Sequence, residues 1–244
     1  MTGTLYGLGV GPGDPELLTL KAHRLLTSAG VVVYPAPDTG DSFARSIVAR
    51  YMTPDQVEIP IVIPMRGERF PAQAIYDGAA AEIARRLDTG ADVVVLCEGD
   101  PFFYGSFMYL YERLGTRYPT EIVPGVSSVM ASAAALGRPL AARNDVLSIV
   151  PAPLGDDEIR RRIDAADAVA IIKIGRHFGR IGALLEKMNL VGAAAYVERV
   201  GLPEQKLMPL AEAIGEEAPY FSMILIYKGA EAWIAAAGAS GGRA

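Results

Sequence analysis

Acidic and hydroxyl side chains gather in three short glycine-containing segments of this 244-residue chain. The segments are Gly9–Asp14, Glu98–Ser106 and Pro124–Ser128. Each follows a short apolar run that is typical of a buried strand. Carboxylates, hydroxyls and backbone amides at strand ends are suited to binding a small polar ligand. We therefore expect the three segments to converge on one edge of one sheet.

The residue types in these segments argue against a phosphate ligand. Asp14 stands where a dinucleotide-binding fingerprint has its third glycine, and no Gly-Lys-Ser/Thr sequence follows. Carboxylates such as Glu98 and Asp100 favour a cationic or hydroxyl-bearing ligand, and S-adenosylmethionine has both features and no phosphate. Purely structural roles stay open at this point, because Asp14, Asp100 and one of the two serines Ser127 and Ser128 could each simply cap a helix.

The elements that must position these segments follow an alternating pattern. Short apolar runs bounded by Gly, Pro or Asp alternate with longer stretches of helical spacing, which predicts an α/β fold. We predict two tandem α/β domains with mostly parallel or mixed sheets and a cofactor cleft between them. The predicted N-terminal domain spans residues 1–140 and carries the glycine-rich loops, the C-terminal domain spans residues 141–235, and residues 236–244 form a disordered tail.

Composition excludes several classes of function. The net charge is −5 with acids and bases interspersed, so neither a nucleic-acid partner nor an anionic membrane is expected. The sequence has no apolar run of about 18 residues and no basic leader, which predicts a cytoplasmic protein. Cys97, His23 and His177 are the only cysteine and histidines, so no disulfide and no metal site are expected.

The three segments together resemble the signatures of the tetrapyrrole (corrin and porphyrin) methylases. These are Gly-x-Gly-Pro-Gly-Asp, Gly-Asp-Pro and Pro-Gly-x-Ser/Thr-Ser/Ala, and here they appear in the family's order. The resemblance extends to about Gly229. Longer signatures look most like those of the precorrin-2 C-20-methyltransferases, and they are Leu96–Tyr109, Gly137–Leu140 with Arg143–Asp145, Lys173–Phe178 and Pro219–Met223.

The resemblance implies a homodimeric, S-adenosylmethionine-dependent methyltransferase that methylates C-20 of precorrin-2 to give precorrin-3A in cobalamin biosynthesis. Carried over position by position, the implied cofactor-binding residues are Pro12, Glu98, Gly99, Asp100, Ser106, Ser127, Ser128, Ile174, Val197 and Ile226. The last three would contribute mainly backbone contacts around the adenine.

The implied substrate carries several acetate and propionate groups, so cationic side chains are needed to bind it. The candidate substrate-binding residues are Arg66, Arg69, Arg138, Arg143 and Arg176. A general base would assist loss of a proton from the methylated carbon, and Asp100, Tyr104 and His177 are candidates by residue type. The sequence leaves the catalytic residue itself unassigned.

Other functions remain open. The nearest are a sister tetrapyrrole methylase acting on another ring position, a methyltransferase acting on a cobalt-containing precorrin, and a relative that modifies diphthamide or ribosomal RNA. The absence of a basic stripe disfavours RNA, and the missing glycine fingerprint disfavours a nucleotide-linked dehydrogenase. A non-catalytic tetrapyrrole carrier is a different class, and it would bind the macrocycle without needing S-adenosylmethionine.

Overall fold

The computed structural model describes residues 1–64 and 72–234, and the chain divides into two compact units, Met1–Ser127 and Ser128–Ala244. The division falls before helix α5 (Ser128–Ala135), whereas the sequence pattern places it after Leu140. Arg138 explains the difference, because its guanidinium donates a hydrogen bond to the backbone oxygen of Leu225 in the second unit. The segment that follows α5, which ends at Ala135, thus belongs to the second compact unit.

The first unit is built on a five-stranded sheet in which every neighbouring pair of strands is parallel. The strand order is β3-β2-β4-β1-β5. The strands are β1 (Leu5–Gly9), β2 (Val31–Pro37), β3 (Val57–Ile63), β4 (Val93–Cys97) and β5 (Thr120–Val123).

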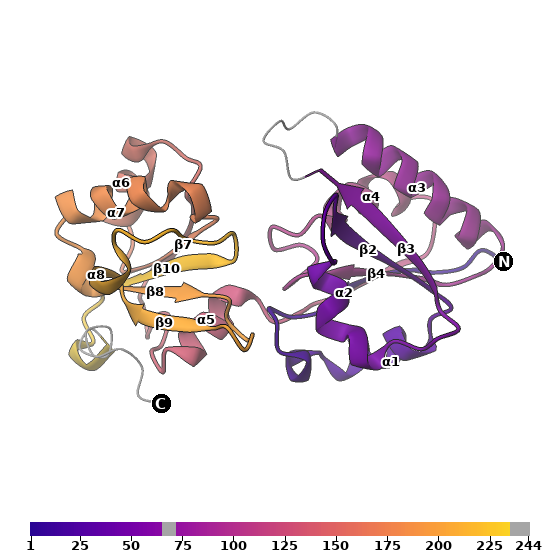
Figure 1. Cartoon of the computed structure of the whole chain (residues 1–244), viewed down its shortest axis with the longest axis horizontal. Helices are drawn as coiled ribbons and strands as arrows, with labels where there is room; N and C mark the ends of the chain where they lie inside the picture. Colours follow the sequence, from indigo (N-terminus) through magenta and orange to yellow (C-terminus); the bar gives the residue numbers. More distant parts are fainter. Residues whose placement is uncertain (65–71, 235–244) are drawn as a thin grey trace. The chain divides into compact units, whose positions relative to one another are not determined.

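Helices cover both faces of this sheet, as expected for parallel strands (Figure 1). Helices α1 (Leu20–Ser28) and α2 (Phe43–Val48) pack on one face against Leu8, Val32 and Val94. On the other face, α3 (Ala72–Asp88) and α4 (Phe107–Leu114) pack against residues that include Val33 and Val95. Two short 3-10 helices complete the unit, η1 (Pro15–Leu17) after β1 and η2 (Ala49–Tyr51) after α2.

The second unit contains a mixed five-stranded sheet in the order β6-β7-β10-β8-β9. Strands β6 and β7 are parallel, and the other neighbouring pairs are antiparallel. The strands are β6 (Leu147–Pro151), β7 (Ala168–Ile172), β8 (Ala194–Glu198), β9 (Lys206–Pro209) and β10 (Ser222–Tyr227). These two sheets confirm the predicted mixed α/β class.

One face of the second sheet carries a large apolar core. Ile171, Ile224 and Tyr196 point into it from three adjacent strands and pack with residues of the covering helices. Those helices are α6 (Asp156–Asp164), α7 (Phe178–Lys187) and α8 (Leu210–Ala213), with 3-10 helices η3 (Gly175–His177) and η4 (Val191–Ala193) beside them.

Within residues 1–64 and 72–234, no helix is both long and apolar enough to cross a membrane. The predicted tail, residues 236–244, and the predicted substrate-binding residues Arg66 and Arg69 lie outside the described residues.

Candidate functional site

The three predicted segments follow β1, β4 and β5, which are adjacent strands in the first sheet. All three strands are parallel, so the segments emerge at the same edge. The chain then turns toward α1 on one face after β1, and toward α4 on the opposite face after β4. Such a switch point, outside the carboxyl ends of the strands, is where open α/β folds bind ligands.

Glycines let the backbones of the three loops touch one another. A Cβ on Gly125 would lie 2.0 Å from the backbone oxygen of Gly99, and one on Gly9 would lie 2.5 Å from the backbone nitrogen of Gly125. Gly11 and Gly99 also exchange two backbone hydrogen bonds, with N···O distances of 3.3 and 2.8 Å. Any side chain at Gly9 or Gly125 would push the loops apart, because the atoms that it meets belong to the backbone.

Asp100 holds the second loop to the third. Its Oδ1 atom accepts hydrogen bonds from the backbone amides of Phe102 (2.9 Å) and Phe103 (3.0 Å). Its Oδ2 atom accepts one from the amide of Gly125, at 3.0 Å. Both carboxylate oxygens therefore stabilise the loop backbone, which gives Asp100 a positioning role beside any contact that it makes with a ligand.

Glu98 is a half-buried carboxylate at the end of β4. Burial raises the pKa of its carboxyl group, and hydrogen bonds from its own amide and from the amide of Ala44 oppose that rise. Ala44 lies in the first turn of α2, so Glu98 connects the end of β4 to the start of that helix. The preceding residue, Cys97, is buried, and burial raises the pKa of its thiol.

The other loop residues predicted to contact the cofactor differ in burial and in hydrogen bonding. Pro12 and Ser127 are buried, and Ser128 begins α5. Ser106 precedes α4 without capping it and is hydrogen-bonded to the side chain of Tyr76. Asp14 accepts a hydrogen bond from the amide of Glu16. It therefore caps the short helix η1, which is the structural role that the sequence left open.

The three predicted contacts around the adenine have fully buried side chains. Ile174 and Ile226 belong to the helix-covered core, and Val197 is 1% exposed. Only backbone atoms at these positions could meet a ligand. Ile226 lies inside the sheet, paired with Val169 on one side and Ala194 on the other, whereas Ile174 follows the end of β7.

Two of the candidate bases have distinctive local structure. Tyr104 has a φ of 58°, a left-handed conformation that is uncommon for an aromatic residue, and the residue is 45% exposed. His177 ends η3, and burial, together with the charges of Arg176 and Arg180, lowers the pKa of its imidazole. The imidazole is therefore neutral at pH 7 and able to accept a proton.

The predicted substrate-binding arginines of the second unit differ in exposure. The side chain of Arg143 is 83% exposed and forms an ion pair with Glu231 at 2.9 Å. Arg176 is also exposed, whereas Arg138 is only 4% exposed. Its burial disfavours contact between Arg138 and a substrate carboxylate. In the parts of the chain that the structure describes, no group of three His, Cys, Asp or Glu side chains is arranged to hold a metal ion.

Sequence reasoning did not identify Gly9 and Gly125 as site residues, nor the bonds from Asp100 to Gly125 and from Ala44 to Glu98. Glycine occurs in both the first and the third segment, and this could have indicated that the two loops pack closely. The two hydrogen bonds join residues far apart in the chain, so spacing along the sequence could not reveal them.

A comparison with protein-family models identifies the same family that the three loop sequences resemble. The model described as Tetrapyrrole (Corrin/Porphyrin) Methylases matches residues 4–214. The chain belongs to this family.

Individual relatives are similar along nearly the whole chain. The cobalamin biosynthesis protein CobIJ of Mycobacterium tuberculosis is 41% identical over 232 residues, covering 92% of this chain and 46% of that protein. The chain thus spans about half the length of that relative. A precorrin-2 C(20)-methyltransferase from Sinorhizobium sp. is 38% identical, with 92% and 95% covered. A cobalt-precorrin-2 C(20)-methyltransferase from Salmonella typhimurium is 32% identical, with 93% and 98% covered.

Solved structures give the same family. Uroporphyrin-III C-methyltransferase from Thermus thermophilus, solved as a complex with S-adenyl homocysteine, matches with a TM-score of 0.65 and 27% identity. The match covers 91% of this chain and 97% of that one.

Proposed function

We propose that this chain is an S-adenosylmethionine-dependent methyltransferase that methylates C-20 of precorrin-2, giving precorrin-3A in cobalamin biosynthesis. The observation that carries the proposal is the similarity to the Sinorhizobium precorrin-2 C(20)-methyltransferase, which spans nearly the full length of both chains. The mycobacterial relative is named for cobalamin biosynthesis and supports the same pathway.

The loops of the first unit suit the proposed cofactor. The segments Gly9–Asp14, Glu98–Ser106 and Pro124–Ser128 contain no lysine or arginine that would pair with a phosphate. They contain carboxylates that favour a cation, and Glu98 lies at the switch point of the sheet. We assign cofactor contacts to Pro12, Glu98, Gly99, Asp100, Ser106, Ser127 and Ser128, with backbone contacts at Ile174, Val197 and Ile226.

When bound, S-adenosylmethionine supplies a methyl group on a positively charged sulfur that is already a good leaving group. The residues of the chain then have to align donor and acceptor, exclude water and accept one proton from C-20. We propose His177 as the proton acceptor, because its lowered pKa keeps the imidazole neutral at pH 7. Asp100 is less suited, since three backbone amides already occupy its oxygens.

The acetate and propionate groups of the substrate need cationic partners. We assign this role to the exposed Arg143 and Arg176 and, outside the described residues, to Arg66 and Arg69. We further propose a homodimer, as the family resemblance implies. From the composition of the chain we propose that it is cytoplasmic and requires no metal ion.

A second candidate is methylation of cobalt-precorrin-2, which the Salmonella relative favours. The two candidate activities, methylation of precorrin-2 and of cobalt-precorrin-2, are distinguished by measuring kcat/KM under anaerobic conditions. The acceptors are precorrin-2, cobalt-precorrin-2 and uroporphyrinogen III. The proposal expects the highest value with precorrin-2. A higher value with cobalt-precorrin-2 would assign the cobalt branch, and one with uroporphyrinogen III would move the activity to another ring position. Macrocycle binding without methyl transfer to any acceptor would indicate a carrier.

A further inference from the structure

The second sheet has an edge at which two strands that run in the same direction end. Strands β7 and β8 both pair antiparallel with β10, which lies between them, so they are parallel to each other (Figure 1). Ile172, the last residue of β7, pairs with Met223. Glu198, the last residue of β8, pairs with Ser222, the first residue of β10. The segments that follow β7 and β8 therefore lie on either side of the segment that precedes β10.

A cationic residue in a left-handed conformation directly follows each of these two strands. Lys173 has a φ of 58° and Arg199 has a φ of 51°. The side chains of lysine and arginine make this backbone conformation unfavourable, unlike glycine, which adopts it freely. Strained residues of this kind cluster at binding sites, where the surrounding fold holds a side chain in place for a ligand.

The backbone of two exposed aromatic residues lies between these cationic residues. Tyr220 and Phe221 precede β10, are 62% and 40% exposed, and have ring centroids 5.1 Å apart. The oxygen of Phe221 accepts a hydrogen bond from the amide of Arg199 at 2.8 Å. On the other side, a Cβ on Gly175 would lie 3.8 Å from the Cα atom of Tyr220, so the segment after β7 is also close to the aromatic pair.

Positive side chains outnumber negative ones at these strand ends. Three cationic residues and one acidic residue stand in the segments 172–177, 198–200 and 219–223. The acidic residue, Glu198, is buried, and its Oε1 atom lies 3.5 Å from Nη1 of Arg199 and 3.6 Å from Nζ of Lys206. Lys173 and Arg176 are exposed and add positive charge after β7. The combination suits a ligand that has an apolar ring and several carboxylates.

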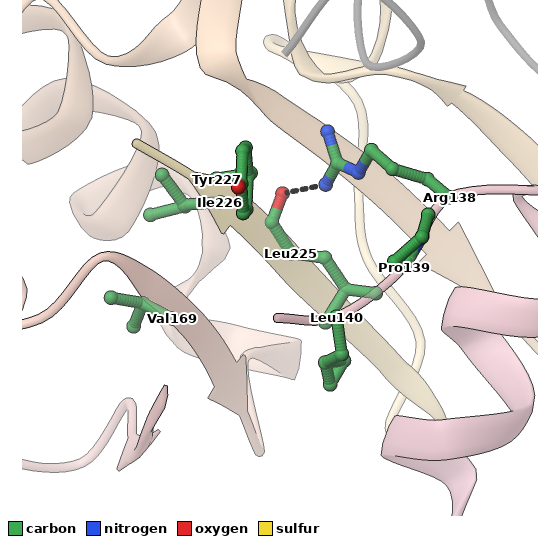
Figure 2. A pocket seen from close by; sticks show the side chains of 7 residues that line it. All are labelled: Arg138, Pro139, Leu140, Val169, Leu225, Ile226 and Tyr227. Atoms are coloured by element: carbon green, nitrogen blue, oxygen red, sulfur yellow. Dashed lines mark hydrogen bonds between the residues drawn. The ribbon is translucent and has the colours of Figure 1, made fainter. Parts of the chain in front are cut away.

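Arg138 does not belong to this edge. Its Nη2 atom donates a hydrogen bond to the oxygen of Leu225, inside β10, at 2.8 Å (Figure 2). The strand begins at Ser222, so Arg138 meets the sheet away from the strand ends. The exposed cations at the edge are therefore better placed than Arg138 to bind a substrate.

We propose that this edge of the second sheet binds the macrocycle of the substrate through Lys173, Arg199, Tyr220 and Phe221. The two aromatic rings contact the apolar ring surface, and the two cations pair with acetate or propionate groups. The inference rests on the proposed function in taking a tetrapyrrole as the ligand. It adds four residues to the substrate contacts proposed above.

Binding of uroporphyrin III by the full chain tests this site without any methyl transfer. This stable macrocycle carries acetate and propionate groups, and its fluorescence reports binding. Lys173→Gly removes the cation and also relieves the left-handed backbone, because glycine adopts a φ of 58° without strain. We expect the Kd for uroporphyrin III to rise by about three- to tenfold, with a Tm no lower than that of wild type. An unchanged Kd would overturn the role of Lys173.

Asn189→Gly is the matched control. Asn189 also has a left-handed φ, of 55°, and it is exposed just after the C-terminal end of α7. This variant relieves the backbone in the same way, so its Tm should be no lower than that of wild type and its Kd for uroporphyrin III should stay unchanged. An equal rise in Kd in both variants would show that backbone relief, rather than loss of the cation, weakens binding, and would contradict the proposal.

Coproporphyrin III, which has methyl groups in place of the acetates, separates the charge contacts from the ring contacts. Lys173→Met and Arg199→Met should reduce the preference of the wild type for uroporphyrin III, whereas Tyr220→Ala should weaken the binding of both porphyrins equally. The affinity for S-adenosylhomocysteine should stay the same in all three variants.

Two outcomes separate this inference from the proposed function. Unchanged porphyrin binding in all three variants, or no binding of uroporphyrin III by the wild type, would overturn the inference. Porphyrin binding that depends on these residues, without methyl transfer to any acceptor, would support the inference and contradict the proposed function instead.

Discussion

At the residue scale, two carboxylates of the loop after β4 have different structural roles. Asp100 uses both oxygens to hold backbone amides of two loops. Glu98 is half-buried beside the thiol of Cys97 and bonded to the first turn of α2. Asp100 therefore connects two loops, whereas burial raises the pKa of the Glu98 carboxyl group. Each role can be tested by a substitution.

Replacing Asp100 tests its role as a connector between loops. Asp100→Ala removes three charge-assisted hydrogen bonds and should lower the free energy of unfolding by about 1.5–3 kcal/mol. Asp100→Asn keeps an oxygen for the amides of Phe102 and Phe103 and loses only the bond to Gly125. The free energy of unfolding should therefore fall by roughly half as much as in Asp100→Ala. Urea denaturation measures both values, and equal stability of Asp100→Ala and wild type would show that these bonds do not hold the loops.

Glu98→Gln tests the half-buried carboxylate through the pH dependence of stability. The folded-state pKa of Glu98 is raised above its ordinary value of 4.5, so its contribution to stability is complete below about pH 4.5 and is lost as pH rises through the folded pKa. Glutamine does not titrate and can still accept the bond from Ala44. The variant should therefore gain stability relative to wild type between pH 4 and pH 7. Urea midpoints at several pH values measure this difference, and a constant difference would contradict it.

At the element scale, the site depends on three strand-end loops packed backbone to backbone. The contact between Gly125 and Gly99 leaves no room for a methyl group on Gly125. Gly9 also lies against Gly125. The spacing of the three loops is therefore fixed by contacts between their backbones.

Gly125→Ala should separate these loops. We expect a loss of about 2 kcal/mol in stability and a fall of at least about tenfold in S-adenosylmethionine affinity, because the new methyl group meets backbone atoms that cannot move independently. The matched control is Gly78→Ala in the middle of α3, where a Cβ meets no described atom within 4 Å. That variant should gain about 0.5–1 kcal/mol from helix propensity and keep its affinity. Calorimetry measures both effects, and unchanged cofactor affinity in Gly125→Ala would refute the role of the loop contact.

Most of the elements could be predicted from the sequence, and those that were missed have physical explanations. The apolar runs at the other eight strands predict buried strands, but β3 contains Pro60 and β9 is short and polar at its start. Both lie at sheet edges, where a strand needs fewer hydrogen bonds and less apolar character.

The sequence was enough to predict which loops form the site, but not the contacts of individual side chains within it. Three glycine-containing segments after apolar runs indicated one sheet edge, and the family model confirms the family they resemble. Which oxygen of Asp100 holds which amide, and the burial of Arg138, depend on contacts between distant segments. Neither leaves a periodic pattern in the sequence.

At the scale of the whole molecule, one chain combines a unit with a parallel sheet and a unit with a mixed sheet. The proposed contacts to the cofactor and the substrate come from both units, so the proposal requires both units for activity. The proposed acceptor distinguishes this chain from sister enzymes that share the loops, and the position of the new methyl group identifies the acceptor carbon.

The measurement that tests this account most directly is anaerobic incubation of the purified chain with precorrin-2 and S-adenosylmethionine carrying a ¹³C-labelled methyl group. Mass spectrometry counts the methyl groups that are added, and ¹³C NMR locates them on the ring. We predict one added methyl group, at C-20. Methylation at another ring carbon, or no transfer by a protein that binds both ligands, would contradict the proposed function.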